Sequence, residues 1–177
     1  MEEYVDILND VGEVTGEIIT KKEAHKTGKW HRAIHIWIIS EDKKRLLLQK
    51  RCAEKKLFPN MWDISVGGSA VSGDDSRQAA QREAVEELGL QLKITHRPNF
   101  NINFDGGFDD FYLIDWDGDI STLKLQYSEV ESVKWATRED ILSMIKDGTF
   151  VPYYPSLINM IFDMKNSPVK YGAHFRE

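Results

Sequence analysis

The sequence predicts an α/β domain in which a mixed β-sheet is sandwiched between α-helices. Residues 30–40 are rich in β-branched and aromatic side chains, and the charged turn 41–44 leads from them into a second apolar segment, 45–51. Within residues 67–90, Ala80, Ala84, Val85 and Leu88 recur at helical spacing and are predicted to form an apolar stripe. Strands followed by helices that each have one apolar face favour a sheet covered by helices.

Residues 1–28 are predicted to form an N-terminal hairpin extension. Segments 4–8 and 14–19 have the composition of strands, and the turn-rich residues 9–12 link them. A short helix at 21–26 follows and ends at Gly28, because glycine is favoured just beyond a helix C-terminus.

The central pair of strands, 30–40 and 45–51, precedes the helix, and more elements follow it. Turn residues at 105–107 and a capping pattern at 137–140 mark two of their boundaries. We expect further strands at 91–94, 100–104, 108–116 and 129–135, and helices at 141–146 and 156–165. Since no repeat or linker interrupts this order, residues 1–177 are predicted to form one domain.

Composition excludes several classes of protein. No apolar run approaches the roughly 18 residues of a membrane-spanning helix, and residues 1–10 do not have the pattern of a secretory signal. The single cysteine, Cys52, fits a cytoplasmic protein. The net charge of −6 disfavours binding to a nucleic-acid polymer, so an anionic substrate needs local basic residues or a bound metal ion. The apolar hairpin is a candidate pairing surface for a homodimer.

Residues 67–90, GGSAVSGDDSRQAAQREAVEELGL, concentrate the candidate chemistry. On a helix, Glu83, Glu86 and Glu87 project from one side, opposite the apolar stripe. Neighbouring carboxylates repel one another, and a divalent cation such as Mg²⁺ or Mn²⁺ offsets that repulsion because it prefers oxygen ligands. Arg82 can orient one of the carboxylates. The alternative interpretation is a solvated acidic helix face.

The glycines and charges of this stretch resemble the Nudix box, the signature of the Nudix hydrolase superfamily. The matching positions are Gly68, Asp74, Arg82, Glu83, Glu86, Glu87, Gly89 and Leu90. Asp74 departs from the pattern, since the family normally has glutamate there. The resemblance implies the Nudix fold and Mg²⁺-dependent hydrolysis of a phosphoanhydride bond in a nucleoside diphosphate, or another small organic diphosphate, linked to a further group.

The resemblance also implies roles for individual residues. Glu83, Glu86 and Glu87 are the expected metal ligands together with the main-chain carbonyl of Gly67, and Mn²⁺ is an alternative to Mg²⁺. Glu83 and Glu86 are the expected catalytic carboxylates, with Arg82 orienting the first glutamate.

Two further sets of candidates come from residues outside the box. The basic side chains Arg32, Lys50 and Arg51 are candidate ligands of substrate phosphate, with ordinary solubility as the alternative. Asp109 and Asp110 are predicted to face opposite sides of a strand, and Asp110 approximates the position where the resembled family places a strand carboxylate near the metals. The resemblance thus implies that Asp110 is an additional metal ligand or orients water, with solvation of a hairpin end as the alternative.

Residues 31–90 are similar to the Nudix branch that contains type I isopentenyl-diphosphate isomerase. His31 matches a metal-binding histidine of that branch, and Pro59 and Trp62 repeat its Pro-x-x-Trp turn. Gly67 and Ser69, however, stand where the isomerase has its catalytic cysteine and a second metal-binding histidine. Hydrolysis is therefore the favoured activity. A catalytically silent nucleotide-binding module, which Asp74 would favour, and a prenyl-diphosphate isomerase are the alternatives.

Overall fold

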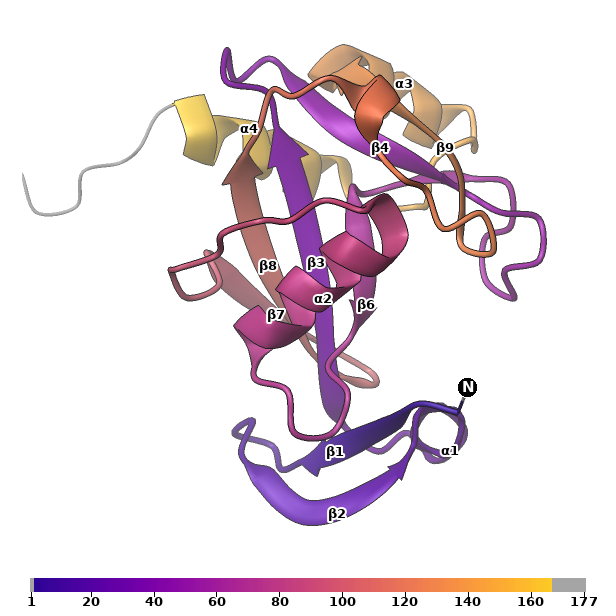
Figure 1. Cartoon of the computed structure of the whole chain (residues 1–177), viewed down its shortest axis with the longest axis vertical. Coiled ribbons are helices and arrows are strands. Elements are labelled where there is room, and N and C mark those ends of the chain that lie inside the picture. The colour runs from indigo at the N-terminus through magenta and orange to yellow at the C-terminus, as the bar shows by residue number, and fades with distance from the viewer. Residues whose placement is uncertain (1, 167–177) are drawn as a thin grey trace, which may run out of the picture.

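The computed structural model describes residues 2–166, so residues 1 and 167–177 of the predicted domain lie outside the described part. A seven-stranded mixed sheet forms its centre (Figure 1). Along the main path the strand order is β5-β4-β3-β8-β7, while β6 pairs with β3 and β9 pairs with β4. The strands are β3 (His31–Ile39), β4 (Arg45–Arg51), β5 (Trp62–Asp63), β6 (Val66–Ser69), β7 (Phe100–Phe104), β8 (Gly107–Asp115) and β9 (Val130–Thr137).

Strand β3 is the axis of this sheet. It pairs in parallel with β8 along its whole length and in antiparallel fashion with β6. It meets β4 only where Ile39 pairs with Leu46, and Figure 1 shows β4 and β9 turning away from β3 and β8. The strand β6, which begins the predicted motif, therefore lies beside β3 on the side away from β8.

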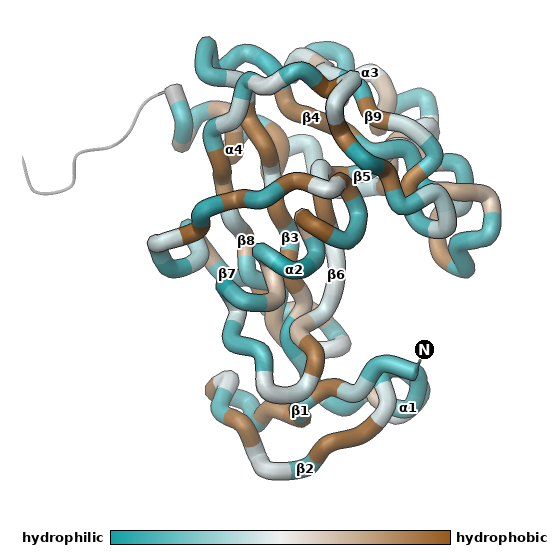
Figure 2. Tube along the Cα trace, viewed as in Figure 1, coloured by the Kyte–Doolittle hydropathy of each residue, from teal (hydrophilic) through white to brown (hydrophobic). Residues whose placement is uncertain are grey.

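Alternation along β3 gives the sheet two buried faces. The side chains of Ile34, Ile36 and Ile38 pack with those of α2 (Ser76–Leu88) in one core. Trp37 and Ile39 point the opposite way and belong to a second core with residues of α3 (Arg138–Lys146) and α4 (Pro155–Asn166). Figure 2 shows the hydrophobic segments of β3 and β4, and most of their apolar residues are buried. The predicted α/β architecture, with a mixed sheet between helices, is confirmed.

Both ends of α2 are fixed by local interactions. At its N-terminus the Asp75 carboxylate accepts hydrogen bonds from the backbone N–H groups of Arg77 and Gln78, and the Gln78 side chain accepts from the Asp75 N–H in return. At its C-terminus Gly89 adopts a left-handed conformation, with φ of 64°, that satisfies the last carbonyl groups. These interactions fix where the helix that carries the glutamates begins and ends.

The predicted N-terminal hairpin extension is present. Strands β1 (Tyr4–Leu8) and β2 (Val14–Thr20) form a separate two-stranded sheet, and α1 (Lys21–Thr27) ends at Gly28. Val5, Ile7 and Ala24 form a small core of their own. Figure 1 shows this unit below the main sheet, close to the loop that precedes α2.

One predicted strand is wrong. Residues 91–94 pair with no other strand, although Leu92 and Ile94 are buried in the core beside α2 as their alternation predicts. The segment instead leads toward the edge strand β7, and a one-turn 3-10 helix (Ile120–Thr122) lies between β8 and β9. Among residues 2–166, no helix has the length and apolar character needed to cross a membrane.

Candidate active site

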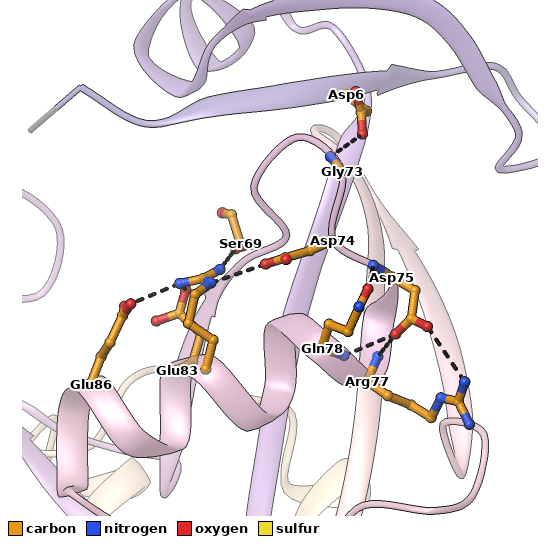
Figure 3. Close-up of polar contacts among 10 residues, drawn as sticks. Asp6, Ser69, Gly73, Asp74, Asp75, Arg77, Gln78, Glu83 and Glu86 are labelled. Carbon is orange, nitrogen blue, oxygen red and sulfur yellow. Dashed lines mark hydrogen bonds and ion pairs between the residues drawn. The ribbon is translucent and has the colours of Figure 1, made fainter.

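Arg82 joins three parts of the chain around the acidic face of α2 (Figure 3). Its Nε donates to Asp74 Oδ2 at 3.0 Å, and its Nη2 donates to the carbonyl oxygen of Ser69 at 2.9 Å. Its Nη1 lies 3.0 Å from Glu83 Oε1 and 3.1 Å from Glu86 Oε2. The predicted orienting role of Arg82 toward Glu83 agrees with this geometry, and Asp74 binds the guanidinium while Asp75 caps the helix.

Glu83 lies directly against the backbone of Gly68. A Cβ atom at Gly68 would stand 2.1 Å from the carboxyl carbon of Glu83, so no larger residue fits while the carboxylate stays in place. Only 8% of Glu83 is exposed, and this burial raises the pKa of its carboxyl, while Arg82 opposes the shift. The glycine of the motif is therefore required by the space that the glutamate occupies.

Glu87 is the most deeply buried of the three glutamates, with 4% of its surface exposed. Its Oε2 accepts hydrogen bonds from the backbone N–H of Gly67 at 3.3 Å and from Nε2 of Gln49 at 3.2 Å. Burial, reinforced by the charge of Glu83, raises the pKa of Glu87 to about 8. Two carboxylates held together in a poorly solvated place create a demand for positive charge.

The donor chemistry of this face fits a hard divalent cation. Glu83 and Glu87 supply carboxylate oxygens, and half-exposed Glu86 stands one helical turn from Glu83. As the side chains lie, Arg82 holds Glu83 and Glu86, and no three His, Cys, Asp or Glu side chains within residues 2–166 are grouped as metal ligands. Arg82 bonds one oxygen of Glu83 (Oε1) and one of Glu86 (Oε2), so the second oxygen of each carboxylate is left for a cation.

The N-terminal extension holds the loop that carries Asp74. Asp6 of β1 accepts a hydrogen bond from Ser72 Oγ at 2.8 Å and another from the Gly73 N–H at 3.0 Å, and the Ser72 N–H donates to the carbonyl oxygen of Tyr4. Figure 3 shows Asp6 above this loop and Asp74 pointing from it in the direction of Glu83 and Glu86, where it accepts the hydrogen bond from Arg82. Anchoring of the loop lets the shorter aspartate reach the guanidinium at 3.0 Å.

A cavity of about 710 Å³ opens beside the strand β6. Gly67, Gly68 and Ser69 form part of its wall, and His35, Phe58 and Tyr153 are among its other lining residues. Four basic side chains also line it, namely Lys21, Arg51, Lys55 and Lys56. Three acidic side chains, Glu54, Asp63 and Glu129, line it as well, so an anionic substrate would compete with Asp63 for Arg51 and with Glu129 for Lys55.

Of the three predicted phosphate ligands, the structure brings Arg51 alone to this cavity. Arg51 bonds to Asp63 at 2.8 Å within it, whereas its neighbour Lys50 pairs with Glu131 at 2.9 Å, because adjacent strand residues point to opposite faces. Arg32 lines a second cavity near the extension, where it bonds to Asp110 at 2.7 Å. The prediction for Arg32 and Lys50 is therefore not supported by their placement.

Sequence reasoning missed three basic residues of the cavity, Lys21, Lys55 and Lys56. Lys55 follows Arg51 by four residues and forms an ion pair with Glu129, so the run of positive charge after β4 was an available signal. Lys21 comes from α1 of the extension and forms an ion pair with Glu3. No local pattern connects Lys21 with the motif, since only the folded chain brings it there.

The contacts of Asp110 do not support its predicted role as an additional metal ligand. Asp110 is buried and its two oxygens accept hydrogen bonds from Arg32 and from Asn101, each at 2.7 Å. Asp109 points to the other side of β8, as expected, and lies 3.7 Å from His35 Nε2. Burial, and then the charge of Asp110, raises the pKa of Asp109 to about 7.

Two residues that bear on the isomerase comparison, His31 and Cys52, are both buried. His31 is buried under the extension, where its ring centroid is 5.0 Å from that of His25. Cys52 is buried and its Sγ donates to the carbonyl oxygen of Ser128 at 2.9 Å. A structural role for this thiol agrees with the interpretation of the sequence.

Comparison with known proteins assigns the family. The sequence model of the NUDIX domain matches residues 29–156, well over half of the chain. The chain belongs to the Nudix family. It is 40% identical over 168 residues to the Nudix hydrolase lin0387 of Listeria innocua, an alignment that covers 94% of this chain and 97% of the relative.

Proteins named as Nudix hydrolases and proteins named as isopentenyl-diphosphate isomerases both resemble the chain. The isopentenyl-diphosphate Δ-isomerase of Pectobacterium atrosepticum is 33% identical over 170 residues, covering 96% of this chain and 86% of the isomerase. The crystal structure of DR0079 from Deinococcus radiodurans superposes with a TM-score of 0.75 at 26% identity, covering 90% of this chain and 99% of DR0079. The predicted Nudix fold, hydrolase class and isomerase-like branch are confirmed.

Proposed function

We propose that this Nudix protein hydrolyses a phosphoanhydride bond in a nucleoside diphosphate, or another small organic diphosphate, linked to a further group. One observation carries the proposal: the buried carboxylates of Glu83 and Glu87 adjoin Gly67 and Gly68, whose strand forms a wall of the basic cavity. A site for cations beside a site for anions fits a metal–diphosphate substrate.

The proposed metal ligands are Glu83, Glu86, Glu87 and the main-chain carbonyl of Gly67. Mg²⁺, or Mn²⁺ in its place, would neutralise the diphosphate and polarise the bond to be broken. Arg82 keeps Glu83 and Glu86 in position from its anchor on the Ser69 carbonyl.

The basic residues of the cavity do the rest of the binding in this proposal. Arg51, Lys21 and Lys55 hold phosphate oxygens by charge-assisted hydrogen bonds. A water molecule attacks phosphorus, its proton passes to a carboxylate of the site, and the bridging oxygen leaves with the other phosphoryl group. We extend the proposed Nudix domain to the whole chain, 1–177, with residues 1–28 as an extension that supplies Lys21.

Replacement of the glutamates tests this proposal. In a screen of nucleoside diphosphates, triphosphates, dinucleotides and nucleotide sugars with Mg²⁺ or Mn²⁺, we expect the wild type to release phosphate or a nucleoside monophosphate. The double variant Glu86→Gln, Glu87→Gln should lose this activity and keep a thermal melt near that of the wild type. Glu41→Gln, at an exposed turn, is the matched control. Undiminished turnover by the double variant would show that the proposed metal role is wrong.

Two other outcomes identify different functions. Asp74, which stands where the family has glutamate and bonds to Arg82, favours a catalytically silent module. Such a module would bind a nucleotide from the panel and release no product. Similarity to a protein named as an isomerase makes prenyl-diphosphate isomerisation the second alternative. That reaction would incorporate solvent deuterium into the product without releasing phosphate.

A further inference from the structure

Gln49 of β4 contacts Glu87 of α2 across the core that lies between the sheet and this helix. It lies in β4, next but one to Leu47, and both side chains face the α2 side of the sheet. Only 3% of Gln49 is exposed. Its Nε2 donates to Glu87 Oε2 at 3.2 Å, and this bond joins a central strand to the most buried glutamate of the motif.

The other half of the Gln49 amide is unsatisfied. Its Oε1 is fully buried and accepts no hydrogen bond from the described residues. An unmade hydrogen bond at a buried carbonyl costs about 1–3 kcal/mol, so an apolar side chain would suit this position better if packing alone mattered. The orphaned oxygen belongs to the same planar amide whose N–H₂ contacts Glu87, so a potential oxygen ligand stands close to that carboxylate.

The chemistry of a neutral amide suits a metal site. A lysine or arginine in place of Gln49 would pair with Glu87 and supply the positive charge that the carboxylates require, leaving less demand for a cation. An amide orients Glu87 without neutralising it. Amide carbonyl oxygens also belong to the hard donors that Mg²⁺ and Mn²⁺ accept, either directly or through a bound water.

We propose that Gln49 is a positioning residue of the metal site, which orients Glu87 through Nε2 and supplies Oε1 to the bound divalent cation or to one of its water ligands. The inference rests on the proposed function, because it assumes that the glutamates bind a cation. It adds a residue from outside the Nudix box, from a strand that no motif of the sequence connects with metal binding.

The test is a titration with Mn²⁺, in which electron paramagnetic resonance measures the free ion and no turnover is needed. Gln49→Met keeps the length of the side chain and removes both polar groups. We expect it to weaken Mn²⁺ binding about 10- to 100-fold, the usual effect of removing a group that supports metal ligands. Gln91→Met, at an exposed position outside the core, should bind as the wild type does.

Two more variants separate the metal role from a role in folding. Gln49→Glu retains an oxygen at the site and should recover most of the Mn²⁺ affinity that Gln49→Met loses, although without metal its charge beside Glu87 should lower the melting temperature. Gln49→Asn withdraws both polar groups by one methylene and should bind Mn²⁺ with intermediate affinity. It also serves if the methionine variant does not fold.

The outcomes distinguish this inference from the proposed function. If the wild type binds Mn²⁺ and Gln49→Met, or Gln49→Asn where the former does not fold, binds it equally well, Gln49 has no metal role and the proposed function stands. If the wild type binds no Mn²⁺, the metal platform of the proposed function is wrong, and the inference is overturned with it. Weaker binding by Gln49→Met, with recovery in Gln49→Glu, supports the inference.

Discussion

Adding a single methyl group at Gly68 should disable the site. The Cβ of Gly68→Ala would lie 2.1 Å from the Glu83 carboxyl carbon and 2.2 Å from its Oε1, far inside van der Waals contact. Gly68 does not have the left-handed backbone that favours glycine, so alanine introduces this collision without a conformational penalty of its own. The neighbouring variant Gly67→Ala provides a matched control, because its Cβ would meet nothing closer than Ile64 Cδ1 at 3.4 Å.

The size of the effect follows from the contact that the methyl group breaks. Glu83 must move away from β6, which costs its bond to Arg82 and removes a proposed metal ligand. A hydrogen bond to a charged group contributes about 1.5–3 kcal/mol, which corresponds to roughly a 10- to 150-fold loss of kcat/KM. Loss of the ligand itself acts in the same direction, so about 100-fold is the expected order of magnitude.

Turnover and metal binding measure this effect independently. Gly68→Ala and Gly67→Ala are compared in kcat/KM on a diphosphate that the wild type cleaves, and in Mn²⁺ affinity. We expect both quantities to fall strongly for Gly68→Ala and to change only a few-fold for Gly67→Ala. Equal behaviour of the two variants, with both folded, would refute the reasoning that the Glu83 carboxylate occupies the space above Gly68.

Three more predictions concern the surroundings of the site. The pKa of Asp109 is raised from 3.8 to about 7, so ionisation of this carboxyl destabilises the folded protein as pH rises from about 4 to 7. The variant Asp109→Asn should therefore be more stable than the wild type at pH 8, by up to about 4 kcal/mol, and similar to it at pH 4. Urea melts at the two pH values measure this difference. Asp6→Ala leaves Ser72 Oγ and the Gly73 N–H without their acceptor and should lower the melting temperature and kcat together, whereas a change in neither would mean that the loop is held without it. Lys55→Ala should raise KM about tenfold with a smaller change in kcat, as expected for a lost phosphate contact, and a steady-state assay that finds KM unchanged would remove Lys55 from the substrate site.

Local patterns carried much of the fold and the centre of the site. The alternation in β3 and the capping residues of α2 act over a few residues, so the elements and the shared face of Glu83, Glu86 and Glu87 were predictable. Residues 91–94 show the limit of this reasoning. They alternate as a strand does, yet a strand also needs a partner with free backbone groups, and partners are decided by the whole chain.

The composition of the cavity depended on contacts between distant segments. Arg32 and Arg51 are both basic strand residues and each pairs with an aspartate, but Arg51 lines the cavity beside β6, whereas Arg32 bonds to Asp110, 78 positions away, in the second cavity. Gln49 gave no signal either, because its significance comes from Glu87, which lies 38 positions further along the chain. Charge and residue type indicated candidates, whereas strand pairing and side-chain direction selected among them.

The family match begins at residue 29, yet Lys21 lines the basic cavity and Asp6 anchors the loop that carries Asp74. The cavity and the anchored loop thus both include residues that lie outside the region matched by the family model. A chimera that took residues 1–28 from a relative would therefore exchange Lys21 of the proposed phosphate-binding wall together with the loop anchor Asp6. Differences in substrate choice between such relatives can consequently arise in a segment that contains no part of the motif.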